Sequence, residues 1–128
     1  MADDSQLYDL VCCSEVVEHV DDQRNFLQTC TQLVKPNGLF FVSSIAKTPK
    51  GYFLNIVLGE HVLGLVPKGT HEWDYLISHE TVQEYLTAVQ FKTVAKTGVT
   101  LANPVTKEMC ETSCMDSNYM LMTKRQTN

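Results

Sequence analysis

The fold is decided by residues 7–45, which read LYDLVCCSEVVEHVDDQRNFLQTCTQLVKPNGLFFVSSI. The first part, 7–13, is a nearly continuous apolar run, which is typical of a parallel strand buried on both faces. A helix is predicted to open at Asp21, because acidic side chains favour the positive N-terminal end of a helix. The residues KPNG at 35–38 end this helix and turn the chain, and a second buried strand follows at 39–45. Strand, helix and strand in this order predict a βαβ unit.

Three further elements are predicted beyond this unit. A helix starts after Ser78, which is a suitable N-cap, and its apolar face runs to about Val89. Residues 91–97 alternate in the manner of a strand. After a polar loop that contains cysteines, residues 119–122 predict a weaker strand, and the tail at about 124–128 is expected to be frayed.

The composition excludes some classes of function. A chain of 128 residues with 44% hydrophobic residues suits one packed domain. Its 10 basic and 15 acidic residues give a net charge of -5, which argues against a nucleic-acid surface. The first four residues, Met-Ala-Asp-Asp, are acidic and no apolar segment follows them, so neither a secretory signal nor a transit peptide is predicted.

The five cysteines are an odd number, and the adjacent pair Cys12-Cys13 suits core packing better than a disulfide. Cys12 and Cys13 are adjacent in a predicted strand, so their side chains should point to opposite faces. Cys110 and Cys114 lack the second Cys/His pair that would complete a zinc site. We therefore expect a reducing compartment.

A polar turn at 14–19, SEVVEH, follows the first predicted strand. Open α/β sheets bind their ligands beyond the carboxyl ends of the strands, which is where this turn would lie. If the turn enters a helix, Glu15, Glu18 and His19 stand at positions i, i+3 and i+4 and share one face. The sequence therefore predicts that two carboxylates and an imidazole converge there.

Such a group suits a divalent cation with mixed oxygen and nitrogen ligands, and Mg, Mn, Fe, Co and Zn are all compatible with it. A cation that held a phenol oxygen would favour the phenolate and orient it toward an electrophilic methyl group. A simpler interpretation stays open, because acidic residues are favoured in the first turn of any helix and His19 would then only pack or cap.

Residues 52–66, YFLNIVLGEHVLGLV, are apolar but too few to span a membrane. They suit either a buried helical hairpin or a helix at a lipid surface, with these side chains inserted: Tyr52, Phe53, Leu54, Val57 and Leu58. The Lys/Arg-rich face typical of surface helices is missing, so the residues by themselves favour buried core.

Three motifs resemble those of class I S-adenosylmethionine-dependent methyltransferases. Residues 8–11 with 14–20 (YDLV, SEVVEHV) look like the fourth strand of these enzymes and the turn after it. Residues 33–39 (LVKPNGL) are similar to the approach to their fifth strand. Residues 66–73 (VPKGTHEW), together with the SEVVEHV turn, resemble the ubiquinone-biosynthesis O-methyltransferases, which methylate catechol-type polyprenyl intermediates. The resemblance covers about 8–98.

The resemblance implies an α/β fold, namely the C-terminal half of a Rossmann-like class I methyltransferase sheet. One partial domain at 1–128 would supply strands four to seven, with a helical insertion after the fifth strand at about 47–77. The implied function is S-adenosylmethionine-dependent O-methylation of a polyprenyl catechol with divalent-metal assistance. The family's Gly-rich loop and ribose-binding acid have no counterpart in the sequence, so the chain looks truncated and is expected to be inactive alone. The alternative is a non-catalytic metal- or lipid-binding partner in a quinone-synthesis complex.

The resemblance also implies roles for single residues. Ser14 would contact the methionine end of S-adenosylmethionine. Glu15, Glu18 and His19 would bind the metal, with Mg²⁺ as the first candidate and Zn, Mn, Fe or Co as alternatives.

On the substrate side, His71 and Trp73 match a family signature, and a structural role suits both equally well. The family's insertion is associated with membrane contact, so the resemblance favours a lipid-facing role for 52–66. It further implies a mitochondrial location on the matrix side of the inner membrane. The membrane surface and other quinone-biosynthesis enzymes would be the partners.

Overall fold

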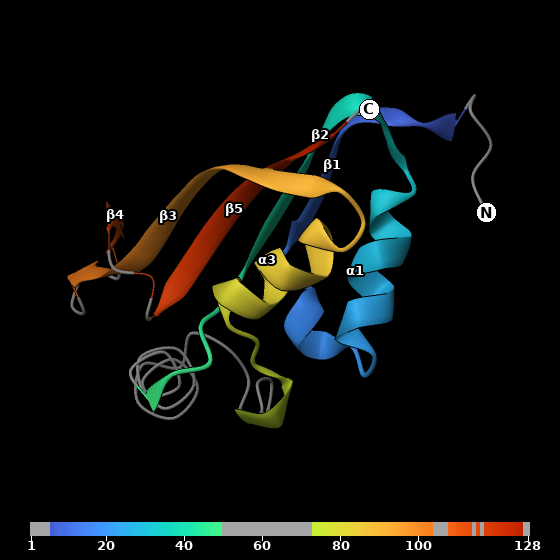
Figure 1. Ribbon diagram of the computed structural model, residues 1–128. Coiled ribbons are helices and arrows are strands. Elements are labelled where there is room, and N and C mark those ends of the chain that lie inside the picture. Colours follow the sequence, from blue (N-terminus) through green and yellow to red (C-terminus); the bar gives the residue numbers. More distant parts are fainter. Residues whose placement is uncertain (1–5, 50–72, 104–107, 114, 116, 127–128) are drawn as a thin grey trace.

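The computed structural model describes residues 6–49, 73–103, 108–113, 115 and 117–126. Their elements, in chain order, are β1 (Tyr8–Ser14), the 3-10 helix η2 (Val17–His19), α1 (Gln23–Thr31), β2 (Val34–Ile45), the 3-10 helix η4 (Trp73–Tyr75), α3 (His79–Thr87), β3 (Phe91–Asn103), β4 (Glu108–Thr112) and β5 (Asn118–Arg125). The strands form one sheet in the order β1-β2-β5-β3-β4. Figure 1 shows α1 and α3 on the same side of this sheet. The predicted α/β class is confirmed.

The first half of the chain forms the predicted βαβ unit. β1 and β2 are parallel neighbours, whereas the other strand pairs are antiparallel. α1 begins after Asp22, whose side chain accepts a hydrogen bond from the backbone N–H of Asn25 at 3.1 Å. This cap satisfies one of the N–H groups that a helix leaves unpaired at its start.

The turn predicted at 35–38 is instead part of β2. The strand starts at Val34, and Asn37 within it has a φ of 64°. Gly38 follows, where an added Cβ would lie 2.6 Å from Cγ1 of Val34 and 2.8 Å from the carbonyl oxygen of Lys35. The KPNG residues therefore form an irregular start to the strand, with a glycine required by close packing.

The hydrophobic core lies between the sheet and the two helices. Phe40 of β2 and Phe91 of β3 pack edge to face, with ring centroids 6.3 Å apart. The other buried members of the same cluster come from β1, η2, both α-helices, β2, β5 and adjoining residues: Cys13, Val17, Leu27, Val34, Val42, Ala46, Ile77, Val82, Leu86, Tyr119 and Leu121. This cluster fixes the helices against the strands.

The second half of the chain agrees with the prediction in part. α3 begins after the predicted N-cap Ser78, whose side chain accepts from the N–H of Thr81 at 3.1 Å. The strand predicted at 91–97 continues to residue 103 as β3, and β4 lies where a loop was predicted. The prediction of a frayed tail is wrong for its first residues, because Lys124 in β5 pairs with β2 and β3, and Arg125 pairs with β3.

The sheet face that turns away from the helices carries exposed apolar side chains. In β1, Cys13 is buried and Cys12 is exposed, which confirms that their side chains point to opposite faces of the sheet. Leu10 points to the same face as Cys12 and is 47% exposed. Cys114 and the apolar segment at 52–66 lie outside the described residues. Among the helices that are described, none is long and apolar enough to span a membrane.

Candidate functional site

The turn after β1 does not continue into the predicted α-helix. Glu15 has a φ of 55°, and its N–H donates to the carbonyl oxygen of Ser43 at 3.0 Å, so the chain is still tied to β2 there. Only the short η2 follows, with Glu18 buried and His19 exposed. The predicted helical face of Glu15, Glu18 and His19 is therefore wrong. The left-handed backbone at Glu15 interrupts the helical path that this face would require.

Glu18 is the most unusual side chain of this turn. It is 2% exposed, and its Oε2 accepts a hydrogen bond from the hydroxyl of Ser44 in β2 at 2.7 Å. Its Oε1 is buried without a hydrogen-bond partner. The Nε2 of His19 lies 3.9 Å from this oxygen, beyond hydrogen-bonding distance. A buried carboxylate oxygen without a partner is costly, which points to a ligand that Oε1 would contact.

Glu15 brings a second carboxyl group to the same place. Although the residue as a whole is exposed, its carboxyl group contacts the side chains of Glu18 and Asn118. Burial of this group and the negative charge of Glu18 raise the pKa of Glu15 to about 7, while a hydrogen bond with Asn118 opposes the rise. Two carboxyl groups so close together favour sharing a proton or holding a cation.

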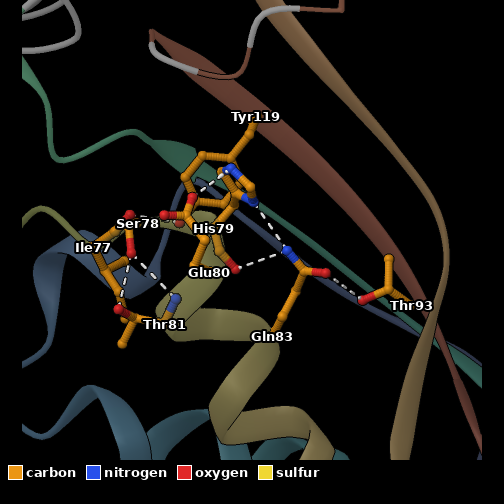
Figure 2. Close-up of polar contacts among 8 residues, drawn as sticks. All are labelled: Ile77, Ser78, His79, Glu80, Thr81, Gln83, Thr93 and Tyr119. Carbon is orange, nitrogen blue, oxygen red and sulfur yellow. Dashed lines mark hydrogen bonds and ion pairs between the residues drawn. The ribbon is translucent and has the colours of Figure 1, made fainter.

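A buried hydrogen-bonded group supports Glu18 from the helix side of the sheet. Ser44 is fully buried, and beside it lies the hydroxyl of Tyr119, which donates to the carbonyl oxygen of Ile77 at 2.7 Å. Figure 2 shows this bond and the ring of His79, which packs edge to face on Tyr119 with centroids 5.9 Å apart. Burial raises the pKa of Tyr119 far above its ordinary value, so the hydroxyl keeps its proton. The position of Glu18 is therefore fixed by side chains of β2 and β5 and, behind them, by the backbone carbonyl of Ile77 before α3.

The cluster in Figure 2 continues along α3. Gln83 contacts Nδ1 of His79 at 2.9 Å and accepts from the hydroxyl of Thr93 in β3 at 3.1 Å. The Nε2 of His79 lies 2.6 Å from a carboxylate oxygen of Glu80. These contacts hold the start of α3 against the sheet and so stabilise the support of Tyr119.

A cavity of about 300 Å³ lies next to these carboxyl groups. Ser14, Glu15 and Asn118 line it with Ser43, and Phe41 and Met120 give it an apolar wall. The hydroxyls of Ser14 and Ser43 are 3.1 Å apart. Ser14 thus stands at the carboxyl end of β1, beside the cavity, which is compatible with the contact to a cofactor predicted for it.

The predicted substrate-side and membrane-contact residues add nothing to the description of this cavity. His71 and the residues proposed for membrane contact (Tyr52, Phe53, Leu54, Val57 and Leu58) lie outside the described residues. Trp73 begins η4. Sequence reasoning missed Ser44, Tyr119 and Asn118. The polar pair Ser43-Ser44 at the end of an apolar strand was a signal for the first of them.

The carboxyl groups fit a divalent cation better than the imidazole does. Within the described part of the chain, no three side chains of the types His, Cys, Asp and Glu lie close enough together to hold an ion. The carboxyl groups of Glu15 and Glu18 nevertheless lie side by side, and Oε1 of Glu18 has no hydrogen-bond partner, so a cation could bind to it. The side chain of His19 is 42% exposed.

Comparison with known proteins agrees with this fold. A family model described as a methyltransferase domain matches residues 1–96. The chain is 39% identical over 127 residues to the ubiquinone biosynthesis O-methyltransferase of Rhizobium johnstonii, covering 99% of this chain and 51% of that protein. It thus spans about half the length of the curated relatives it matches.

Solved structures show the same architecture at low sequence identity. A possible histamine N-methyltransferase of Thermotoga maritima matches 94% of this chain and 57% of its own, with a TM-score of 0.64 and 12% identity. An S-adenosylmethionine-dependent methyltransferase of Archaeoglobus fulgidus matches 94% of this chain and 60% of its own, with a TM-score of 0.63 and 18% identity. Because the family model covers three quarters of the sequence, the chain belongs to the methyltransferase-domain family.

Proposed function

We propose that this chain is part of an S-adenosylmethionine-dependent O-methyltransferase of ubiquinone biosynthesis. Its substrate would be a catechol-type polyprenyl phenol, methylated with the assistance of a divalent cation. The names of the relatives support the reaction and its pathway. The observation that carries the cation is the buried Oε1 of Glu18, which has no partner and lies beside a second carboxyl group.

The reaction would be a direct displacement. The catechol oxygen forms a bond to the methyl carbon, the carbon–sulfur bond breaks with its electron pair left on sulfur, and the phenol proton leaves to solvent. A divalent cation, when bound, would supply positive charge that favours the deprotonated phenol.

The chain's own residues would bind and orient the reactants. Glu18, immobilised by Ser44, and Glu15 would hold the cation, with Mg²⁺ as the first candidate and Zn, Mn, Fe or Co as alternatives. Ser14 would bind the methionine end of S-adenosylmethionine beside the cavity of about 300 Å³. The apolar wall that Phe41 and Met120 give this cavity suits an aromatic ring and would exclude water from it.

The remaining expectations from the sequence are part of the same proposal. His19 would bind the same cation through its exposed imidazole, and His71 and Trp73 would lie toward the substrate. Residues 52–66 would contact the inner mitochondrial membrane from its matrix side, next to other quinone-biosynthesis enzymes. We further propose that these 128 residues transfer methyl groups slowly or not at all by themselves, because relatives that catalyse the reaction are about twice as long.

A titration of the purified chain tests the proposal. Mg²⁺ and S-adenosylmethionine are added separately and together in a calorimeter, and methyl transfer to a short-prenyl catechol is followed with a labelled methyl group. We expect Mg²⁺ to bind the wild type and the control variant Glu84→Gln, which changes an exposed glutamate of α3. We expect Glu18→Gln to lose this binding.

The outcomes separate the parts of the proposal. If the wild type binds neither Mg²⁺ nor Mn²⁺, cation assistance is wrong. Rapid methyl transfer by the wild type, lost in Glu18→Gln, would support the reaction and refute the inactivity of the isolated chain. If the chain binds cation and membrane vesicles, but transfers no methyl group to a catechol even when it is fused to the N-terminal half of a relative, the non-catalytic role replaces the enzymatic one.

A further inference from the structure

The cavity at the acidic turn (residues 14–19) continues into a second cavity along the sheet. The first has a volume of about 300 Å³ and the second of about 260 Å³. Phe41 of β2 and Met120 of β5 line both cavities, so the two share a wall. Met122 and Ala95 extend the lining of the second cavity toward β3. We call this second cavity, with its floor of Phe41, Met120, Met122 and Ala95, the side groove.

Strand pairing places the floor of the side groove on one face of the sheet. Phe41 pairs with Met122 across β2 and β5, and Met122 pairs with Ala95 across β5 and β3. Paired residues of neighbouring strands point to the same face. Leu121, next to Met122 in the chain, belongs to the core under the helices, so Met122 points the other way. The side groove therefore runs across β2, β5 and β3 on the face away from α1 and α3 (Figure 1).

The side groove is apolar beside the acidic turn and polar at its other end. Phe41, Met120 and Met122 are half-buried, and methionine side chains adapt their shape to apolar ligands. Toward β4 the groove is lined by Lys96 and Glu111, which also line a further cavity of about 480 Å³. The apolar part is thus short, and it begins at the candidate site.

We propose that the side groove binds the first isoprene units of the prenyl tail of the substrate. This inference rests on the proposed function and adds the place where the tail is recognised. An aromatic ring in the cavity at the acidic turn has polar side chains on one side and Phe41, Val99 and Met120 on the other. A hydrocarbon tail leaves by the apolar side, because on the polar side it would bury groups without hydrogen-bond partners.

Continuity with the candidate site selects this occupant among apolar partners, because a ligand whose ring lies in the cavity enters the groove at its apolar end. From β2 to β3 the groove crosses two strand spacings, about 10 Å, which accommodates about two isoprene units. Tail recognition should therefore reach a limit at that length.

Methionine methyl groups give a direct readout of the side groove. The purified chain is labelled with carbon-13 at these groups, and the signals are assigned with Met120→Leu and Met122→Leu. A catechol without a tail and catechols with one, two or four isoprene units are then titrated below their micelle concentrations. We expect the Met120 signal to shift with all of them and the Met122 signal only with the prenylated ones. If the groove buries about 40 Å² of each unit, the affinity rises about fivefold per unit up to about two units.

Two lysine variants separate the side groove from the rest of the apolar face. Met122 lines the groove but not the cavity at the acidic turn. Met122→Lys is therefore expected to bind the catechol without a tail as the wild type does, and to lose at least tenfold in affinity for the catechol with two isoprene units. Leu10→Lys, the matched control, changes an exposed residue of β1 on the same face and should keep the tail dependence. Circular dichroism checks that both variants fold.

Each result decides the inference. An affinity that does not depend on the tail, or an unshifted Met122 signal, would overturn it and leave a catechol site at the acidic turn standing. Equal losses in Met122→Lys and Leu10→Lys would also overturn it, because the tail would then adhere to the whole face. So would an equal Met122 shift with phosphatidylcholine vesicles alone, which would assign the groove to a lipid surface.

Sedimentation tests a further occupant of the side groove. A dimer that excludes the prenylated catechols would assign the groove to a second copy of the chain and overturn the inference. If no catechol binds at all, the proposed substrate fails and this inference fails with it. The Met122 shift in the wild type decides the matter even where Met122→Lys does not fold.

Discussion

Replacing Glu18 by glutamine should make the metal-free chain more stable. Glu18 is 2% exposed, with one oxygen paired to Ser44 at 2.7 Å and the other unpaired beside Glu15. The variant Glu18→Gln keeps the shape and the bond from Ser44. It replaces the unpaired oxygen by an amide that can donate to Glu15, and it removes a buried charge.

The size of the stability gain follows from the unpaired Oε1 of Glu18. A buried polar group without a partner costs about 1–3 kcal/mol, and amide substitution recovers part of this, so we expect about 1–2 kcal/mol of added stability. For a chain of 128 residues this corresponds to a Tm higher by roughly 4–7 °C.

The gain should depend on pH. The pKa of Glu15 is raised to about 7, so the folded wild type binds more protons than the unfolded chain between the ordinary pKa of 4.5 and that value. The stability that this group contributes is complete at low pH and is lost as the pH rises through about 7. Glu18→Gln removes the charge that repels an ionised Glu15, so its advantage should be larger at about pH 8 than at about pH 5.5.

Thermal unfolding followed by circular dichroism, with a chelator present, measures this effect. Glu84→Gln on the exposed side of α3 should change the Tm by less than about 1 °C, because surface substitutions change stability little. A lower or unchanged Tm for Glu18→Gln at about pH 8 would show that Oε1 is already satisfied in the metal-free chain. The reasoning from its unpaired state would then be refuted.

Three other results are expected. Ser44→Ala should lower the free energy of unfolding by about 1.5–3 kcal/mol in urea titrations, because a buried hydrogen bond to a carboxylate is lost. Cation binding at about pH 6.5 should release up to one proton per ion, since Glu15 is then mostly protonated, and calorimetry in buffers of different ionisation enthalpy counts the protons. Alkylation at about pH 8, followed by mass spectrometry, should modify Cys12 and leave Cys13 intact, because burial raises the pKa of the Cys13 thiol to about 12.

Each of these three predictions has a control or a result that would contradict it. An exposed serine, Ser113→Ala, should leave stability unchanged, and equal loss in both serine variants would contradict a special role of Ser44. Proton release that does not fall at about pH 8.5 would exclude Glu15 as the source. Rapid alkylation of Cys13 under native conditions would mean that β1 opens readily at the sheet edge.

Local patterns predicted the first half of the fold well. The apolar run of β1, the acidic start of α1 and the second apolar strand each depend on neighbouring residues, and all three elements are present. The N-cap at Ser78 also depends only on neighbouring residues, and it is present. The start of β2 was missed, because KPNG favours a turn, and pairing of Val34 with Tyr8 overrides that preference.

Long-range pairing explains the other differences. β4 has a polar sequence and is a strand because it pairs with β3. Lys124 is held by pairing with β2 and β3, and Arg125 by pairing with β3. The same holds for the site. The acidic turn could be found from its spacing, but Asn118 reaches it only through the register of β5 against β2, which no local pattern contains.

The two carboxyl groups have different parts in any binding event. Glu18 is held by a fully buried Ser44 and by Tyr119 behind it, so its free oxygen is preorganised and needs little rearrangement to contact a ligand. Glu15 is open to solvent on one side and is the group that exchanges a proton. If Glu15 holds a cation as proposed, its pKa of about 7 would weaken that binding only about twofold at neutral pH, but roughly a hundredfold at pH 5. In the proposed site, such an acidic pair would exchange its proton for a cation at neutral pH, and the fold would have to tolerate the repulsion between the two carboxyl groups when no cation is bound.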